Sequence, residues 1–257
     1  MFKFEVPVFV HKNVLKKEML DELRDYPLQV SKMMLDGGRD GVLKGTGITW
    51  SDNTLKIQPG LILYGGNIYR MEEEWSTDCP AADQLTYIKV RFSTMGYERN
   101  RMGGMGDIYM DEKPTECGEV ELGRFRLQEG ARLRTEYENF DDYQTEFDTV
   151  NRIHVPYVCS GDVGLWPKLL MEYASELMST ATENIYDISY AMQVMAGNGQ
   201  VAWGLTLWYV EKCMDSMLTD RSNLAVYDKL RHILRERRRG NNCLSRQPNQ
   251  SRQMLLL

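Results

Sequence analysis

The sequence predicts a mixed α+β fold, with an N-terminal arm and helix, an antiparallel β-sandwich-like module, and a C-terminal α-helical region of about three helices. Three observations lead to this prediction. Short apolar runs separated by tight-turn residues fill the stretch from Gly37 to Trp75, strict alternation marks residues 84–92, and apolar residues recur every three or four positions after Gly164. Alternation between turns is typical of strands, and the wider spacing is typical of helices.

The N-terminus is predicted to form an extended arm followed by a helix. Residues 1–10 alternate apolar side chains with others, which fits an edge strand or a segment that docks on a partner. Asn13 is placed to cap a helix that has one apolar and one charged side. Pro27 is expected to end or kink this helix, and one or two further turns are expected to stop at Asp36–Gly38.

Two tight hairpins are predicted in the β module. Ser51–Asn53 separates one pair of apolar runs, and Gly65–Asn67 separates the next pair. Glycine and asparagine tolerate the positive φ angles that short hairpin loops require. Pro59 and Gly60 provide a third break, since proline presets φ for a turn.

The rest of the β module is predicted to hold two longer strands joined by an irregular segment. Residues 84–92 alternate and form a strand with one apolar face. Residues 95–118 are rich in glycine and charge, which predicts a long surface loop or an arm with only a short strand at 107–110. Residues 119–128 form the next strand, in which a change of phase at Gly123 indicates a bulge.

Helical periodicity dominates the C-terminal part of the chain. The apolar residues from Leu170 to Met195 follow an approximate heptad seam, which predicts one helix of about 30 residues. Residues 201–218 and 224–238 predict two more helices. The chain is thus divided into an arm with helices (1–36), a β module (37–130), a linker (131–162), a helical domain (163–239) and a disordered basic tail (240–257).

Composition limits the classes of protein that fit. A net charge of −6 over 257 residues argues against nucleic acid as the main partner. Five widely spaced cysteines without a C-x-x-C pair indicate free thiols in a reducing cytoplasm. No apolar run is long enough for a membrane helix. The arginines between Arg231 and Arg252 either contact a polyanion or, as we favour, complete a solvated helix end and a tail.

No catalytic or metal-binding motif stands out, so we expect neither an enzyme nor a cofactor. The three histidines, His11, His154 and His232, are too scattered for a zinc site, and no G-x-S-x-G elbow is present. Glycosidases need only two carboxylates, and their spacing in sequence is not diagnostic. The candidates for such a pair are Glu72, Glu73, Glu74, Glu116, Glu119, Glu121, Asp141 and Asp142. Charge runs of this kind are more typical of a solvated face.

Two groups of residues are candidates for contacts with other molecules. The arm and the heptad seam suit protein interfaces, and aromatic residues on strands suit sugars or partners. The interface candidates are Phe2, Phe4, Val6, Val8, Leu170, Tyr173, Leu177 and Ile188. The candidates for contact with a glycan or a partner are Trp50, Tyr69 and Trp75. Core packing is the alternative for each of these aromatic residues.

Three stretches, Met19–Pro27, Asp40–Ile48 and Lys56–Tyr69, resemble the N-terminal regions of bacteriophage tail and prophage-type baseplate proteins that connect the tail tip to receptor-binding fibres. The resemblance covers about residues 1–75. It implies a baseplate-associated adaptor of a virion tail or tail-like particle that serves host attachment and is made in the bacterial cytoplasm. Its implied partners are further copies of the chain, as a homo-oligomer and specifically a trimer, and other baseplate and tail-fibre proteins.

Two other classes remain as alternatives. A carbohydrate-binding module that recognises a host receptor would present Trp50, Tyr69 or Trp75 in one exposed plane. A hydrolase that degrades cell-wall material would bring two carboxylates, such as Glu72 and Glu119, into a cleft.

Overall fold

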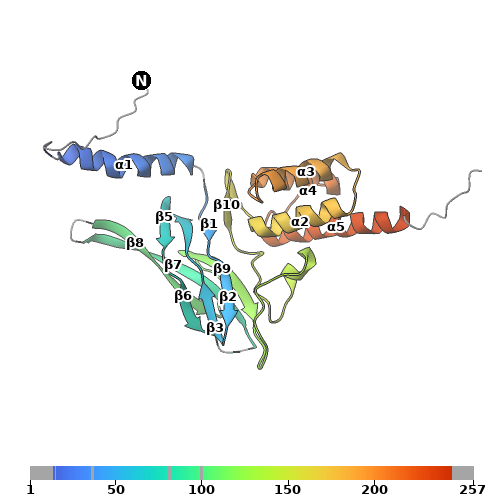
Figure 1. Cartoon of the computed structure of the whole chain (residues 1–257), viewed down its shortest axis with the longest axis horizontal. Helices are drawn as coiled ribbons and strands as arrows, with labels where there is room; N and C mark the ends of the chain where they lie inside the picture. Colours follow the sequence, from blue (N-terminus) through green and yellow to red (C-terminus); the bar gives the residue numbers. More distant parts are fainter. Residues whose placement is uncertain are drawn as a thin grey trace, which may run out of the picture.

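The computed structural model describes residues 14, 16–35, 38–79, 81, 83–98 and 101–244, with backbone alone for 94–98, 101–102 and 241–244. The fold class is confirmed as α+β, with an N-terminal helix, several mainly antiparallel sheets and then helices (Figure 1). The predicted arm at residues 1–10, the predicted cap Asn13 and the tail beyond residue 244 lie outside the described residues.

Helix α1 (Lys17–Met34) is one continuous helix. Pro27 was expected to end or kink the helix, and because it lies inside the helix the expected end is wrong. Proline lacks the N–H that would donate to the Leu23 carbonyl and its ring crowds that carbonyl, yet the helix continues through it to Met34. The helix starts after Lys16, which makes no side-chain cap.

The strands form three sheets. One has the order β11-β10-β1-β4-β5, the second β2-β3-β6 and the third β8-β7-β9, and all pairs are antiparallel except β1 with β10. The bounds of the strands are β1 Gly41–Gly45, β2 Ile48–Ser51, β3 Thr54–Ile57, β4 Gly60–Tyr64, β5 Asn67–Met71, β6 Trp75–Asp78, β7 Leu85–Glu98, β8 Arg101–Asp111, β9 Glu119–Arg126, β10 Tyr157–Cys159 and β11 Asp162–Gly164.

Both predicted hairpins are confirmed. Asp52 and Asn53 have φ angles of 51° and 60° between β2 and β3, and Gly65 and Gly66 turn with positive φ between β4 and β5. The bulge predicted at Gly123 is also present, because the register of β7 with β9 shifts between Ile88 and Lys89, where Gly123 pairs with Ile88.

Residues 95–98 and 101–111 belong to two paired strands, the β7–β8 arm, instead of the predicted long loop with a short strand at 107–110. Strand β7 continues to Glu98 and β8 pairs with it from Arg101 onward. The glycines that suggested a loop lie within this ladder, where Gly104 and Gly106 pair with Thr94 and Phe92. In Figure 1 the arm extends beneath α1 on the side of the molecule away from the C-terminal helices.

The helical part contains η1 (Phe140–Gln144), α2 (Pro167–Ser179), α3 (Ile185–Ala196), α4 (Trp203–Met214) and α5 (Asn223–Leu244). The predicted helix of about 30 residues is therefore two helices. Thr180 ends α2, Ala181 has a φ of 48°, and the Asn184 side chain caps α3 by accepting the Tyr186 N–H at 2.9 Å. A local cap thus outweighs the approximate heptad pattern.

Two hydrophobic cores are present, one within the helices and one within the sheets. The segment predicted as a linker contributes to both: Phe140 and Tyr143 are buried in the helical core, and Val150 and Val155 in the sheet core. Trp166 packs against both cores. The domain boundaries themselves stay a prediction.

Candidate assembly surface

Helix α1 carries an apolar stripe that no other described element covers. Met19, Leu23, Tyr26, Val30 and Met33 follow one another at steps of four, three, four and three residues, which places them along one side of a helix. No residue of α1 is buried. The side chains of Leu23 and Met33 are 54% and 78% exposed, and those of Tyr26 and Val30 are exposed as well. We call these five residues the α1 stripe.

The rest of α1 is mostly polar, and one of its other apolar residues is useful experimentally. Arg24 makes ion pairs with Asp21 and Asp25 on the helix surface. Leu28 is 55% exposed and, at about 3.6 residues per turn, falls on the side opposite the α1 stripe. A single exposed leucine is ordinary, whereas a continuous exposed stripe marks an interaction surface.

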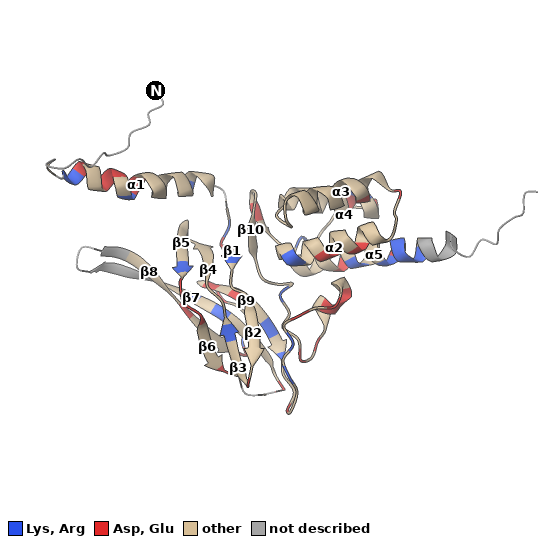
Figure 2. Ribbon diagram, in the orientation of Figure 1, with Lys and Arg blue, Asp and Glu red and all other residues tan. Residues whose placement is uncertain are grey.

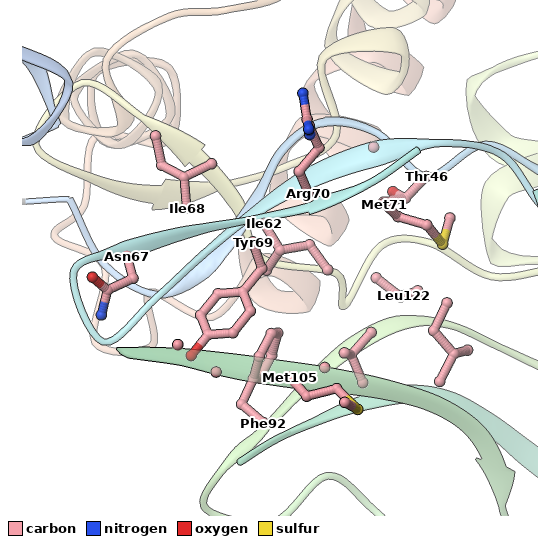
Figure 3. Close-up of a pocket in the computed structure, with 16 residues that line it drawn as sticks. Thr46, Ile62, Asn67, Ile68, Tyr69, Arg70, Met71, Phe92, Met105 and Leu122 are labelled. Carbon is pink, nitrogen blue, oxygen red and sulfur yellow. The ribbon is translucent and has the colours of Figure 1, made fainter. Parts of the chain in front are cut away.

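A cavity of about 780 Å³ lies between β5 and β8 (Figure 3). Ile62, Met71, Val90, Ile108 and Leu122 supply apolar walls. Strand β5 is the last strand of its sheet and β8 is the last strand of another, so two sheet edges face this space. The volume falls within the range of about 300–1,000 Å³ that is typical of binding pockets.

Glycines and stacked aromatic rings shape one end of this cavity. Phe92 stacks on Tyr64 with ring centroids 4.2 Å apart, and Tyr69 meets Phe92 edge-on at 4.7 Å. The Tyr69 ring lies directly on Gly104, where a Cβ atom would come within 2.2 Å of the Tyr69 hydroxyl oxygen. A Cβ atom at Gly106 would meet Phe92 and Val90 at 3.0 Å. The missing side chains therefore leave room for Tyr69 and for the open space beside it.

The predicted interface residues fall into two sets. Phe2, Phe4, Val6 and Val8 lie outside the described residues. Leu170, Tyr173 and Leu177 are buried in the helical core of this chain, with at most 3% exposure, and Ile188 is half-buried. The seam on α2 therefore packs inside the chain and presents no surface to a partner in this structure.

The three aromatic candidates do not form one exposed plane. Trp50 pairs with Leu55, and Trp75 pairs with Ile57. Directly paired residues share a face of a sheet, and Leu55 and Ile57 are fully buried, so both tryptophans lie on the core side of their sheet. Tyr69 alone lines the cavity. This arrangement does not favour a flat platform for sugars.

The candidate carboxylates are either exposed or held by cations. Glu72, Glu73 and Glu74 are exposed. Glu119 is 2% exposed and binds Arg91 at 2.7 Å and Lys89 at 3.1 Å. Burial raises the pKa of Glu119, but hydrogen bonds from the Glu116 N–H, Tyr109, Arg91 and Lys89 outweigh burial and lower the pKa to about 2.

The other acidic candidates pair in the same way. Glu121 accepts two hydrogen bonds from Arg124, and Asp142 binds Arg134 at 2.6 Å. Asp141 accepts from Arg231, from Arg235 at 2.9 Å and from Arg238 at 3.1 Å, where the basic side of α5 meets the acidic η1 segment (Figure 2). These arginines are thus ion-paired within the chain, which corrects the expectation of a solvated helix end. Arg246 and Arg252 lie outside the described residues.

Cys79, Cys213 and His154 are wholly or partly buried, which shifts their pKa values. Burial raises the pKa of both Cys79 and Cys213 to about 11, away from the thiolate form that reacts. Burial and the nearby Arg124 cation lower the pKa of His154. Among the residues that the structure describes, no group of acidic, histidine and cysteine side chains could hold a metal ion, and no helix is long and apolar enough to cross a membrane.

The α1 stripe and the cavity are the features that sequence reasoning missed. The steps of four and three residues were visible, but they continue through Pro27, which was expected to end or kink the helix. The cavity depends on how two separate sheets approach each other, and no local pattern signals that.

No family model and no curated protein matches the chain. It is similar to a chain in a type VI secretion system TssK-TssF-TssG baseplate subcomplex, with a TM-score of 0.40 and 7% identity over 91% of this chain and 100% of that one. It is also similar to TssK in a crystal structure, with a TM-score of 0.41 and 9% identity over 91% of this chain and 69% of that one. Scores and identities this low carry no conclusion about function.

Proposed function

We propose that this chain is a structural component of the baseplate of a phage tail or phage-tail-like particle, and that it acts by binding other polypeptides. In this proposal it is an adaptor between the tail and receptor-binding fibres, it assembles as a homo-oligomer, and it catalyses no reaction. The adaptor role is the one implied by the resemblance of residues 19–69 to tail baseplate proteins.

The α1 stripe is the observation that carries the proposal. No residue of this 18-residue helix is buried against the rest of the described chain, and in proteins most helical stability comes from tertiary packing of an amphipathic face. Its apolar stripe therefore needs a surface to cover it, and steps of four and three residues are the spacing that suits helix-to-helix contact. A second copy of α1 offers a stripe with the same spacing.

The test is the mass of the purified full-length chain, measured by light scattering over a range of concentrations. We expect an oligomer whose mass falls when Leu23→Glu is combined with Val30→Glu, because charges on the stripe cannot be buried in a helix interface. Leu28→Glu is the matched control, on the opposite side of the same helix, and should leave the mass unchanged.

Binding to baseplate components would be measured in parallel with purified particles that lack this chain. Self-association of the wild-type chain together with its incorporation into particles supports the adaptor role. A wild-type chain that stays monomeric at all concentrations and does not bind such particles would overturn the proposal. If the stripe variant and the Leu28→Glu control change the mass equally, the α1 stripe does not mediate self-association.

A further inference from the structure

We propose that the cavity between β5 and β8 receives the segment Phe2–Val10 of a second copy of this chain, which adds to the sheet as an extended strand. This inference rests on the proposed assembly function and names the contact through which copies engage. It differs from the contact through the α1 stripe, so either contact can fail without the other.

An added strand could pair at this cavity because the edges of two sheets border it. Within the part of the chain that the structure describes, β5 pairs only with β4, and β8 pairs only with β7. Each edge therefore has a row of backbone N–H and C=O groups without a neighbouring strand, which is the template for strand addition. Natural proteins usually cover or charge such edges.

The lining of the cavity fits apolar side chains that project at every second position. Val90, Ile108 and Leu122 form its floor, and Gly106 leaves an opening beside the Phe92 ring. Alternate residues of a strand point to the same side, so an added strand would direct every second side chain to this floor. Phenylalanine and valine would contribute the largest burial of apolar area there.

The segment Phe2–Val10 has the matching pattern. Phe2, Phe4, Val6, Val8 and Val10 occupy every second position, and between them lie Lys3, Glu5, Pro7 and Phe9. Nine residues in an extended strand span about 30 Å, and the eleven residues of β8 span about 36 Å on the same basis. Residues 1–13 precede α1 and lie outside the described residues.

The proposed homo-oligomer favours a second copy as the source of this segment. The C-terminal end of α1 leads into β1, whose neighbour β4 pairs with β5. The N-terminal end of α1 is about 27 Å from that end along the helix axis. The segment therefore joins its own copy at the end of α1 that is farther from β1.

Photo-crosslinking tests the inference on the full-length chain and needs no assumption about register. A benzophenone amino acid replaces Phe4 in unlabelled chains, which are mixed with an excess of ¹⁵N-labelled chains without the probe. After irradiation, mass spectrometry identifies the peptides joined to the segment. We expect ¹⁵N-labelled peptides that contain β5 or the Gly103–Ile108 part of β8.

Two pairs of variants test whether the crosslink depends on the cavity and on the apolar face of the segment. Gly106→Val fills the cavity beside Phe92 and should lower the crosslinked yield by about tenfold or more, equivalent to about 1.4 kcal/mol. Asp107→Val is the matched control, because Asp107 pairs with Arg91 on the other face of β8 and does not line the cavity. Val6→Asp should abolish the crosslink and leave the fold of residues 16–244 unchanged. Lys3→Asp, on the other face of the segment, should leave the crosslinked yield unchanged.

Light scattering on the same samples separates this inference from the proposed function. Oligomers that form without crosslinks to β5 or β8 would overturn the strand contact and leave the assembly role intact. Crosslinks to unlabelled peptides alone would show an intramolecular contact and would also overturn it. Equal yields from the Gly106→Val and Asp107→Val chains, when both retain the wild-type melting temperature, would overturn it as well. If Gly106→Val does not fold, the test depends on Val6→Asp, and a crosslinked yield that Val6→Asp leaves unchanged would overturn the strand contact.

Discussion

Buried charges in this protein are matched by partners within the same chain. Asp187 is completely buried and accepts hydrogen bonds from Arg237 at 2.6 Å, Thr182 at 2.7 Å and Tyr209 at 3.1 Å. On the outer side of β7, Lys89 is 1% exposed and contacts both Asp111 and Glu119. Removal of one member of such a pair leaves a buried charge without compensation, so these residues act on stability.

Stability should fall in acid through Glu119. The pKa of Glu119 in the folded chain is about 2, below its ordinary value of 4.5. A depressed pKa contributes stability that is complete above the unfolded-state value and is lost as the pH falls from about 4.5 toward 2. We expect the free energy of unfolding, measured with urea, to decrease across this window.

The variant Glu119→Gln should weaken that pH dependence and lower the stability at neutral pH, because Lys89 and Arg91 then lack their shared carboxylate. Glu129→Gln, an exposed loop position, is the control and should leave both unchanged. If Glu119→Gln keeps the full wild-type slope, the acid sensitivity arises from other groups.

At the scale of elements, local capping and turn residues set the boundaries that periodicity alone misplaces. The break between α2 and α3 occurs where Thr180 bonds the Leu177 carbonyl and Asn184 caps the next helix. The turns at Asp52–Asn53 and at Gly65–Gly66 have the positive φ angles that tight hairpins need. Each of these caps and turns involves residues within a few positions of one another.

The cap at Asn184 should contribute measurably to stability. Asn184→Ala removes the acceptor for the Tyr186 N–H and is expected to lower the free energy of unfolding by about 1 kcal/mol. Asn184→Ser keeps a side-chain oxygen at the cap and should lower it by only a few tenths of a kcal/mol, roughly. Thermal and urea unfolding of the two variants checks this, and equal losses would show that the cap is not the stabilising feature.

At the scale of the whole molecule, the sheet core and the helical core meet at Trp166. This ring lies edge-on to Tyr137 at 6.1 Å, stacks with Tyr157 at 6.2 Å, and has the Arg152 guanidinium 4.5 Å from its centroid. Tyr157 belongs to the sheet core, and Tyr137 packs against the helical core. Trp166 therefore joins the two cores, together with the hydrogen bonds that Asn223 of α5 donates to the Val155 and Gly164 carbonyls.

Loss of this contact should reduce the cooperativity of unfolding. In Trp166→Ala we expect a total loss of about 3–5 kcal/mol and a thermal transition that separates into two, detected by calorimetry. Trp208→Ala is the comparison, since Trp208 is 44% exposed and packs on Tyr186 at the helical surface. A single sharp transition in Trp166→Ala, at a lower temperature, would mean that other contacts couple the cores.

The sequence by itself determined the α+β class, both hairpins, the bulge at Gly123 and the presence of a helix at each end, because alternation and turn chemistry act between near neighbours. Only the tertiary structure decided that the seam from Leu170 to Leu177 is buried, that Asp141 gathers the α5 arginines, and that β5 and β8 leave an apolar cavity between them. These outcomes join residues far apart in the chain. Which surface a side chain finally covers is set by the packing of whole elements, which no short window of sequence contains.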